Sequence, residues 1–217
     1  MSELFDEVDE DVRREQLKKL WDKYSILIIA LAVLIVAGVG GWRGYEYLEA
    51  KKAAEASVLF DKAAELSEAN KHAEAEAAFA DLAAKAPRGY RILARLRTAA
   101  EISHRDKPAA AKMFDDIAAD TSVGAPERDL ARIRAAQLLL ETTPYPKMLQ
   151  RLEPATAKDA TFRHTARELL ALSAWRANDP AATRKWLDVI TEDGESPPAL
   201  RSRAEALQAL LPPVAKS

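Results

Sequence analysis

The fold of this chain is indicated by a segment that occurs twice: HRDKPAAAKMFDDI at residues 104–117 and RANDPAATRKWLDV at residues 176–189. The two copies share a proline, a pair of alanines and a large residue: Pro108 and Pro180, Ala109–Ala110 and Ala181–Ala182, Phe114 and Trp186. Their offset is 72 residues, which is twice 36. A repeat of about that length predicts helical hairpins that stack on one another.

Other parts of the chain follow the same period. A small residue stands four positions before a large one in three places: Ala75/Phe79, Ala110/Phe114 and Ala182/Trp186. Large residues recur at spacings of 35, 35 and 37: Phe79, Phe114, Leu149 and Trp186. Alanines in the intervening segments recur at 37 and 35: Ala94, Ala131, Ala166 and Ala99, Ala136, Ala171. Small residues let helices pack closely, and stacking is expected to bury the apolar face that one hairpin leaves open.

The composition predicts an all-α chain, because alanine, Glu, Lys, Arg and Leu dominate and no alternating strand pattern occurs. Prolines mark the expected helix boundaries, and Asp179-Pro180 predicts an N-cap with proline at the first helical position. We expect a long first helix that runs to about Asn70. Shorter helices are expected near residues 72–85, 89–104, 107–119, 126–142, 145–152, 161–177, 180–192 and 198–210.

A stretch of 19 residues without a charge, YSILIIALAVLIVAGVGGW, occupies residues 24–42. As a helix it would span roughly 28 Å, close to the thickness of a bilayer core. Aromatic residues flank it at both ends, as in interfacial belts: Trp21 and Tyr24, then Trp42, Tyr45 and Tyr47. We therefore expect one transmembrane helix followed by an α-solenoid of about four hairpins and a C-terminal capping helix. The expected parts are residues 1–23, 24–42, 43–211 and a tail at 212–217.

A cleaved signal peptide is the alternative for the apolar stretch. Twenty-three residues precede it, they are rich in acidic residues, and no small-x-small cleavage site follows. These features favour a retained signal anchor. Five basic residues lie on its N-terminal side and three on its C-terminal side: Arg13, Arg14, Lys18, Lys19, Lys23, against Arg43, Lys51, Lys52. This bias predicts a cytoplasmic N-terminus and, in a bacterium, a periplasmic C-terminal domain at the inner membrane.

Two features near the anchor are candidates for contacts. Small residues four apart, Ala37 with Gly41 and Gly40 with Gly44, would let another helix approach in the membrane. The alternative is that these glycines merely loosen the end of the helix. The N-terminal segment could form an amphipathic helix on the lipid surface, but its acidic start favours a solvated tail.

The period, the small-to-large pair and a closing proline (Ala75, Phe79, Pro87) resemble tetratricopeptide repeats. Over its whole length the chain also resembles the ancillary subunit of the SecYEG translocon. The stretch from Glu7 to Trp21, the anchor and the junction GWRGYEYLEAKKAAEAS at residues 41–57 carry that resemblance. It implies a single-pass inner-membrane protein whose periplasmic repeat domain links the translocon to periplasmic chaperones or clients.

No motif for catalysis, a cofactor or a metal is evident. The chain has no cysteine, and His72, His104 and His164 stand in no metal-ligand spacing, so structural or surface roles are expected for them. A net charge of −2 argues against nucleic acid as a partner. We therefore predict a protein that is not an enzyme.

A series of arginines is the candidate binding feature. Six recur at spacings of 37 and 35 on the first helices of successive hairpins: Arg91, Arg128, Arg163 and Arg95, Arg132, Arg167. Members of each i, i+4 pair share a helix face, so stacked hairpins could align them into a groove for acidic or extended peptides. The alternative is a solvated face that Glu127, Asp129 and Glu168 neutralise.

These observations favour a membrane-anchored, non-enzymatic adaptor that binds proteins and contacts lipid through its anchor. A repeat scaffold in cell-envelope assembly or cell division is the second hypothesis. A membrane-tethered hydrolase is the third, and no sequence motif supports it.

Overall fold

The computed structural model describes the backbone of residues 3–213 and the side chains of residues 18, 21 and 23–213. Within residues 3–213 all regular structure is helical, which confirms the predicted all-α class. The helices are α1 (Glu3–Glu68), α2 (His72–Lys85), α3 (Arg88–Ile102), α4 (Lys107–Ala119), α5 (Ala125–Leu139), α6 (Tyr145–Leu152), η1 (Glu153–Thr156), α7 (Arg163–Arg176), α8 (Pro180–Glu192) and α9 (Pro198–Ala209).

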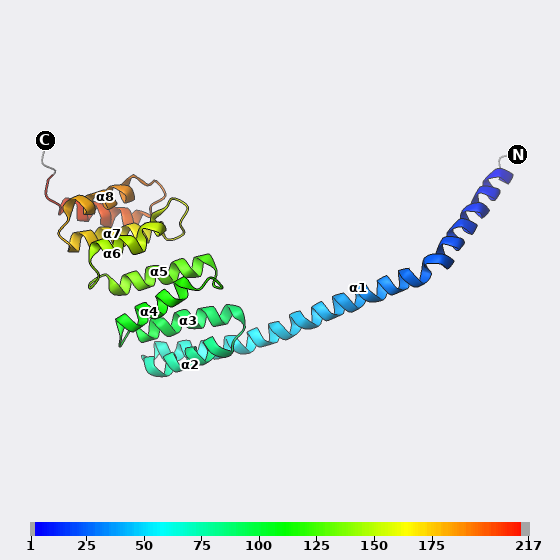
Figure 1. Cartoon of the computed structure of the whole chain (residues 1–217), viewed down its shortest axis with the longest axis horizontal. Helices are drawn as coiled ribbons and strands as arrows, with labels where there is room; N and C mark the ends of the chain where they lie inside the picture. Colours follow the sequence, from blue (N-terminus) through cyan, green and yellow to red (C-terminus); the bar gives the residue numbers. More distant parts are fainter. Residues whose placement is uncertain (1–2, 214–217) are drawn as a thin grey trace. The chain divides into compact units, whose positions relative to one another are not determined.

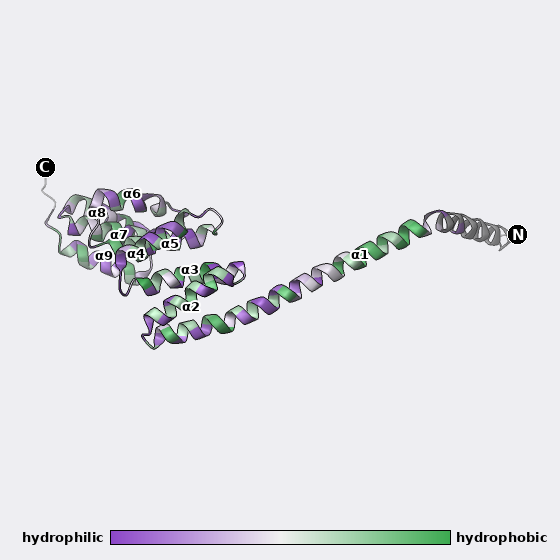
Figure 2. Cartoon of the chain, turned by 60° about the horizontal axis from the view of Figure 1, so that its bottom comes forward, coloured by the Kyte–Doolittle hydropathy of each residue, from purple (hydrophilic) through white to green (hydrophobic). Residues whose placement is uncertain are grey.

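The chain divides into two compact units, Met1–Lys52 and Ala53–Ser217. The first unit holds the apolar stretch of α1, which is long and apolar enough to cross a membrane. Its apolar side chains are exposed on every face of the helix, and Figure 2 shows this stretch as hydrophobic. A long apolar N-terminal helix is therefore present, as the sequence predicts.

The second unit is a row of antiparallel helices. Figure 1 shows α2 and α3 side by side, followed by α4 and α5 and then by α6, α7 and α8. Three apolar clusters form its interior, and each draws residues from consecutive helices. A core that is shared between neighbouring hairpins is typical of a solenoid.

The repeated small and large residues lie where the period predicts. The six alanines at positions 94, 131, 166, 99, 136 and 171 are at most 1% exposed. Phe79, Phe114 and Trp186 are buried, but Leu149 in the third hairpin is only partly buried. Met148 and Leu152 are fully buried there instead, because the short helix α6 turns these two side chains inward.

Helix ends follow the local sequence. The side chains of Asp106 and Asp179 accept hydrogen bonds of 2.9 Å from the N–H groups of Ala109 and Ala182. The second of these is the N-cap that Asp179-Pro180 predicts. After the C-terminal ends of α1 and α7, Asn70 and Asn178 have φ of 58° and 54°, the left-handed conformation that closes a helix.

Most helix boundaries lie within two residues of the expectation, and two features depart further from it. Helix α5 ends at Leu139 rather than near residue 142, because Thr142 and Thr143 donate backbone hydrogen bonds back to Leu139 in a turn before Pro144. After α6, residues Glu153–Thr156 form a 3-10 helix around Pro154, which the repeat pattern does not anticipate.

Candidate functional site

Four of the six repeated arginines are engaged within the protein. Arg95 donates to Asp120 and Arg132 donates to Asp129, each at 2.6 Å. Arg163 and Arg167 both contact Asp193. Arg91 and Arg128 form no ion pair with any residue whose side chain the structure describes. The structure thus places these six arginines along α3, α5 and α7, but it turns most of the charge toward internal carboxylates.

Arg95 and Arg167 play the same part in two different hairpins. Asp120 is the C-cap residue of α4 and Asp193 is that of α8. In each case a guanidinium of the preceding helix reaches the carboxylate that closes the hairpin. The Ser122 hydroxyl and the Arg95 guanidinium lower the pKa of Asp120 from 3.8 to about 2. The contact therefore persists above pH 4 and is lost as the pH falls toward 2.

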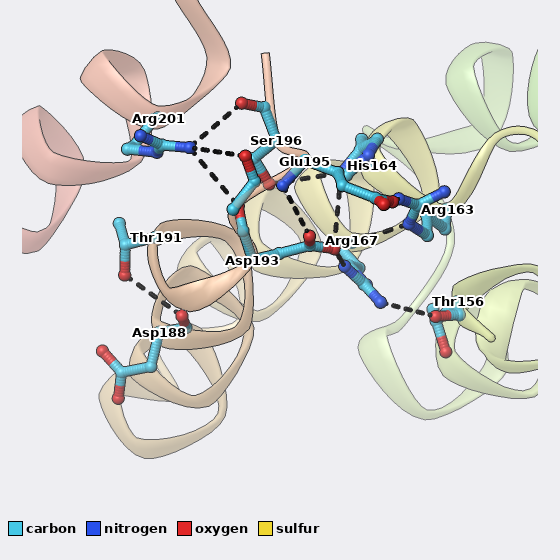
Figure 3. Close-up of polar contacts among 11 residues, drawn as sticks. Thr156, Arg163, His164, Arg167, Asp188, Thr191, Asp193, Glu195, Ser196 and Arg201 are labelled. Atoms are coloured by element: carbon cyan, nitrogen blue, oxygen red, sulfur yellow. Dashed lines mark hydrogen bonds and ion pairs between the residues drawn. The ribbon is translucent and has the colours of Figure 1, made fainter. Parts of the chain in front are cut away.

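The second of these contacts is the centre of a larger polar cluster (Figure 3). Asp193 Oδ2 accepts from Arg167 at 2.6 Å and from Arg163 at 3.4 Å, while its Oδ1 accepts from the N–H of Glu195 at 3.0 Å. Arg167 also donates to the carbonyl of Thr156 at 3.1 Å. The Glu195 N–H and the Arg167 guanidinium hold the pKa of Asp193 below its ordinary value. Arg167 thus joins α7 to both neighbouring hairpin ends.

This cluster also brings together a serine, a histidine and an aspartate. His164 Nδ1 lies 3.2 Å from Ser196 Oγ and 4.0 Å from Asp193 Oδ2. In a nucleophilic triad the two partners contact opposite nitrogens of the ring, whereas here both contact the same nitrogen. Ser196 is 3% exposed, so its hydroxyl is also shielded from a substrate. Burial of the ring lowers the pKa of His164, and the positive charge of the neighbouring Arg163 lowers it further. The arrangement fits a structural role.

Replacing Arg167 with methionine is expected to destabilise the domain by roughly 2 kcal/mol. Methionine keeps the apolar stem of the buried Arg167, but the partly buried Asp193 and Thr156 oxygens lose a charged donor. The matched control is Arg203→Met, whose ion pair with Glu168 is exposed on the arginine side. Its effect should stay within about 0.5 kcal/mol. Urea denaturation of both variants measures the difference, and equal midpoints would contradict the assigned role.

A groove lies between the faces of α3 and α5. It has a volume of about 400 Å³ and is lined by side chains that include Leu93, Leu96, Arg97, Leu130, Arg134 and Gln137. Leu93 is 48% exposed, and Arg97 stands 5.2 Å from the Phe79 ring. Arg134 donates to Gln137 at 3.3 Å and forms no ion pair with the residues described. The groove combines an apolar lining with two guanidinium groups.

Arg97 and Arg134 belong to the same period as the predicted series. They are 37 residues apart, as are Leu93 and Leu130 in the same groove. The predicted arginine series begins two residues earlier, on the helix face where Arg95 and Arg167 pair with hairpin-closing carboxylates. The repeat period therefore includes the groove residues, but it does not indicate which helix face forms the groove.

The remaining candidates have fewer contacts. An added Cβ atom at Gly40, Gly41 or Gly44 would meet no atom within 4 Å, and Ala37 is exposed, so this face of α1 is open. In the N-terminal segment 1–23 only the side chains of Lys18, Trp21 and Lys23 are among the described residues, so the predicted contacts of this segment lie outside them. His72 and His104, for which the sequence indicates no shared role, lie together beside Glu101.

A family model described as a tetratricopeptide repeat-like domain matches residues 18–193. No curated protein and no solved structure matches the chain. The matched residues include the apolar stretch of α1 and every hairpin through α8. A repeat fold of this kind typically serves as a non-enzymatic scaffold for protein–protein interaction. The chain belongs to the tetratricopeptide repeat-like domain family.

Proposed function

We propose that this protein is a membrane-anchored adaptor that holds extended protein segments in the groove between α3 and α5. The groove is the observation that carries the proposal. It is an open apolar channel on successive first helices of the repeat, with arginines at its edge. Such surfaces on solenoids suit partner polypeptides, because the solenoid presents a long row of equivalent positions.

The charge of the groove suggests the chemistry of its occupant. Arg97 and Arg134 offer planar donor groups that match a carboxylate, while Leu93 and Leu130 suit apolar side chains. The favoured ligand is therefore an extended segment with apolar residues around an aspartate or glutamate. Arg91 and Arg128 are further cationic side chains on the same two helices.

The apolar stretch of α1 supports the anchoring part of the proposal. An exposed helix that is hydrophobic on all faces is unfavourable in water and favourable in a bilayer. The family match begins at residue 18, ahead of this stretch, so the stretch belongs to the matched pattern. The five-to-three distribution of basic residues favours a cytoplasmic N-terminus and a periplasmic repeat domain at the bacterial inner membrane. Anchoring would raise the local concentration of a weakly binding surface near its membrane complex.

The resemblance to the ancillary translocon subunit supports one partner in particular. It favours an adaptor that stands beside SecYEG and presents periplasmic chaperones or clients to it. A scaffold in cell-envelope assembly or division would use the same groove with different partners. The identity of the captured proteins therefore distinguishes the two functions.

Copurification of the full chain in mild detergent tests both the groove and the partner. The double variant Leu93→Asp/Arg134→Glu is expected to recover at least about tenfold less partner, because it removes an apolar contact and reverses a charge. Mass spectrometry should identify translocon subunits or periplasmic chaperones among the proteins that are lost. Division or envelope-assembly proteins in their place would favour the scaffold function.

The matched control is Leu210→Asp/Arg184→Glu, which makes the same chemical changes at the exposed Leu210 and the half-buried Arg184 in the C-terminal part of the domain. It should recover the partners as the unchanged protein does. Both variants must keep the thermal unfolding temperature of the unchanged protein. Equal recovery by the groove variant and the control would contradict the proposed binding surface.

A further inference from the structure

Two histidines and a buried glutamate meet near the start of the second unit. His72 begins α2, Glu101 lies in the last turn of α3, and His104 follows that helix. Each offers one ligand atom, and these atoms all lie within 4.8 Å of one another. The imidazole rings of His72 and His104 are stacked, with centroids 3.7 Å apart and planes at 12°. Residues from two helices and a connecting loop thus converge on one point.

The glutamate is held in place before any ligand arrives. Glu101 is 3% exposed, and its Oε1 accepts a hydrogen bond of 2.7 Å from the Ser67 hydroxyl. Burial acts to raise the pKa of Glu101, but hydrogen bonds from Ser67 and His72 outweigh it and the pKa lies below its ordinary value. The side chain is therefore a carboxylate at neutral pH. A fixed outer hydrogen bond of this kind commonly orients metal-binding carboxylates.

The second carboxylate oxygen faces the histidines. Glu101 Oε2 lies 2.8 Å from His72 Nδ1, so one proton bridges the two ligand atoms. A metal ion could take the place of that proton. The imidazole rings of His72 and His104 stack at 3.7 Å, and an unprotonated imidazole nitrogen is a common metal ligand. His104 is exposed, and its side chain is free to turn toward the same point.

We propose that His72, Glu101 and His104 form a binding site for a divalent transition metal ion of the zinc class. Two imidazoles and one carboxylate are a donor set that zinc prefers, and three protein ligands leave a position for water. The ion would join the start of α2 to the end of α3. It would thereby stabilise the first hairpins of the repeat.

The charged residues around this site are compatible with a metal ion, and they also suggest an alternative in which the only ionic partners of Glu101 lie within the protein. Arg97 lies 3.9 Å from Glu101 Oε1, on the oxygen away from His72, and Arg105 is neutralised by Glu76 at 2.8 Å. Without a metal, Arg97 and His72 would serve as the ionic partners of the buried carboxylate. The two interpretations differ in whether the histidines bind an ion.

Isothermal titration of the full-length protein with zinc chloride tests the site. The protein is purified in detergent with a tag other than polyhistidine and stripped with a chelator. One ion per chain is expected to bind at neutral pH. Binding should weaken at about pH 5, where protons compete for the imidazoles. His104→Gln should reduce the affinity at least about tenfold, and His72→Gln should do the same.

His164→Gln is the matched control, because it removes an imidazole that lies in the Asp193 cluster instead. It should leave the zinc titration unchanged. As a second measurement, zinc should raise the thermal unfolding temperature of the unchanged protein but not that of His104→Gln, which alters an exposed side chain. Absence of one-to-one binding, or equal affinities of the His104→Gln and His164→Gln variants, would overturn the proposal.

Discussion

Two arginines in the apolar stretch, Leu31→Arg with Val36→Arg, are expected to release the protein from the membrane. Both side chains belong to the uncharged run of residues 24–42 and are exposed on α1. Each arginine near the middle of a spanning helix costs about 2.5–3.5 kcal/mol of insertion free energy. Together they cost roughly 6 kcal/mol, about a 10⁴-fold change in the partition between membrane and water. Sedimentation of membranes washed at alkaline pH measures this partition.

The same variant also tests the orientation. External protease applied to spheroplasts should degrade the repeat domain of the unchanged protein and leave that of the double variant intact. The matched control is Leu48→Arg/Val58→Arg, which adds the same charge at exposed positions of α1 beyond the apolar run. It should sediment with the membranes. A repeat domain that resists protease in intact spheroplasts would contradict the proposed periplasmic location.

The repeat period explains why the fold could be inferred from sequence. Buried alanines such as Ala94, Ala131 and Ala166 recur because every hairpin must meet its neighbour at the same close approach. The third hairpin departs from the pattern, since α6 is short and buries Met148 and Leu152 rather than Leu149. Periodicity averages over such local adjustments and cannot reveal them.

The candidate sites were harder to infer, because they depend on which face of a helix meets which loop. Arg95 and Arg167 have partners 25 and 26 residues downstream, Asp120 and Asp193, and that repeated spacing is visible in the sequence. Nothing in the spacing says that the carboxylates fold back onto the preceding helix. The cluster of His72, Glu101 and His104 is harder still to infer. His72 and Glu101 are 29 residues apart in the sequence, and only the packing of the helices brings them together.

Phe79→Ala is expected to destabilise the domain by about 3–5 kcal/mol, a large part of the total stability of an ordinary domain. The Phe79 side chain is fully buried, and its ring centroid lies 5.1 Å from that of Phe60 at the end of α1. Removing the ring leaves a cavity beside Ala75 and takes away the cation–π contact with Arg97. The matched control is Leu93→Ala, which shortens a side chain that is 48% exposed. Its effect should stay within about 0.5 kcal/mol in urea denaturation.

The part of the domain that Phe79→Ala destabilises is as informative as the size of the loss in stability. In a solenoid each hairpin contacts its neighbours, so a defect near α2 should propagate along the row rather than act on all helices at once. Amide hydrogen exchange should therefore increase most in residues 53–102 and least in residues 163–209. The latter range belongs to a separate apolar cluster around Leu170 and Ile190. If protection instead fell uniformly across α2 to α9, the domain would unfold as one cooperative body, and the nearest-neighbour description of its stability would be wrong.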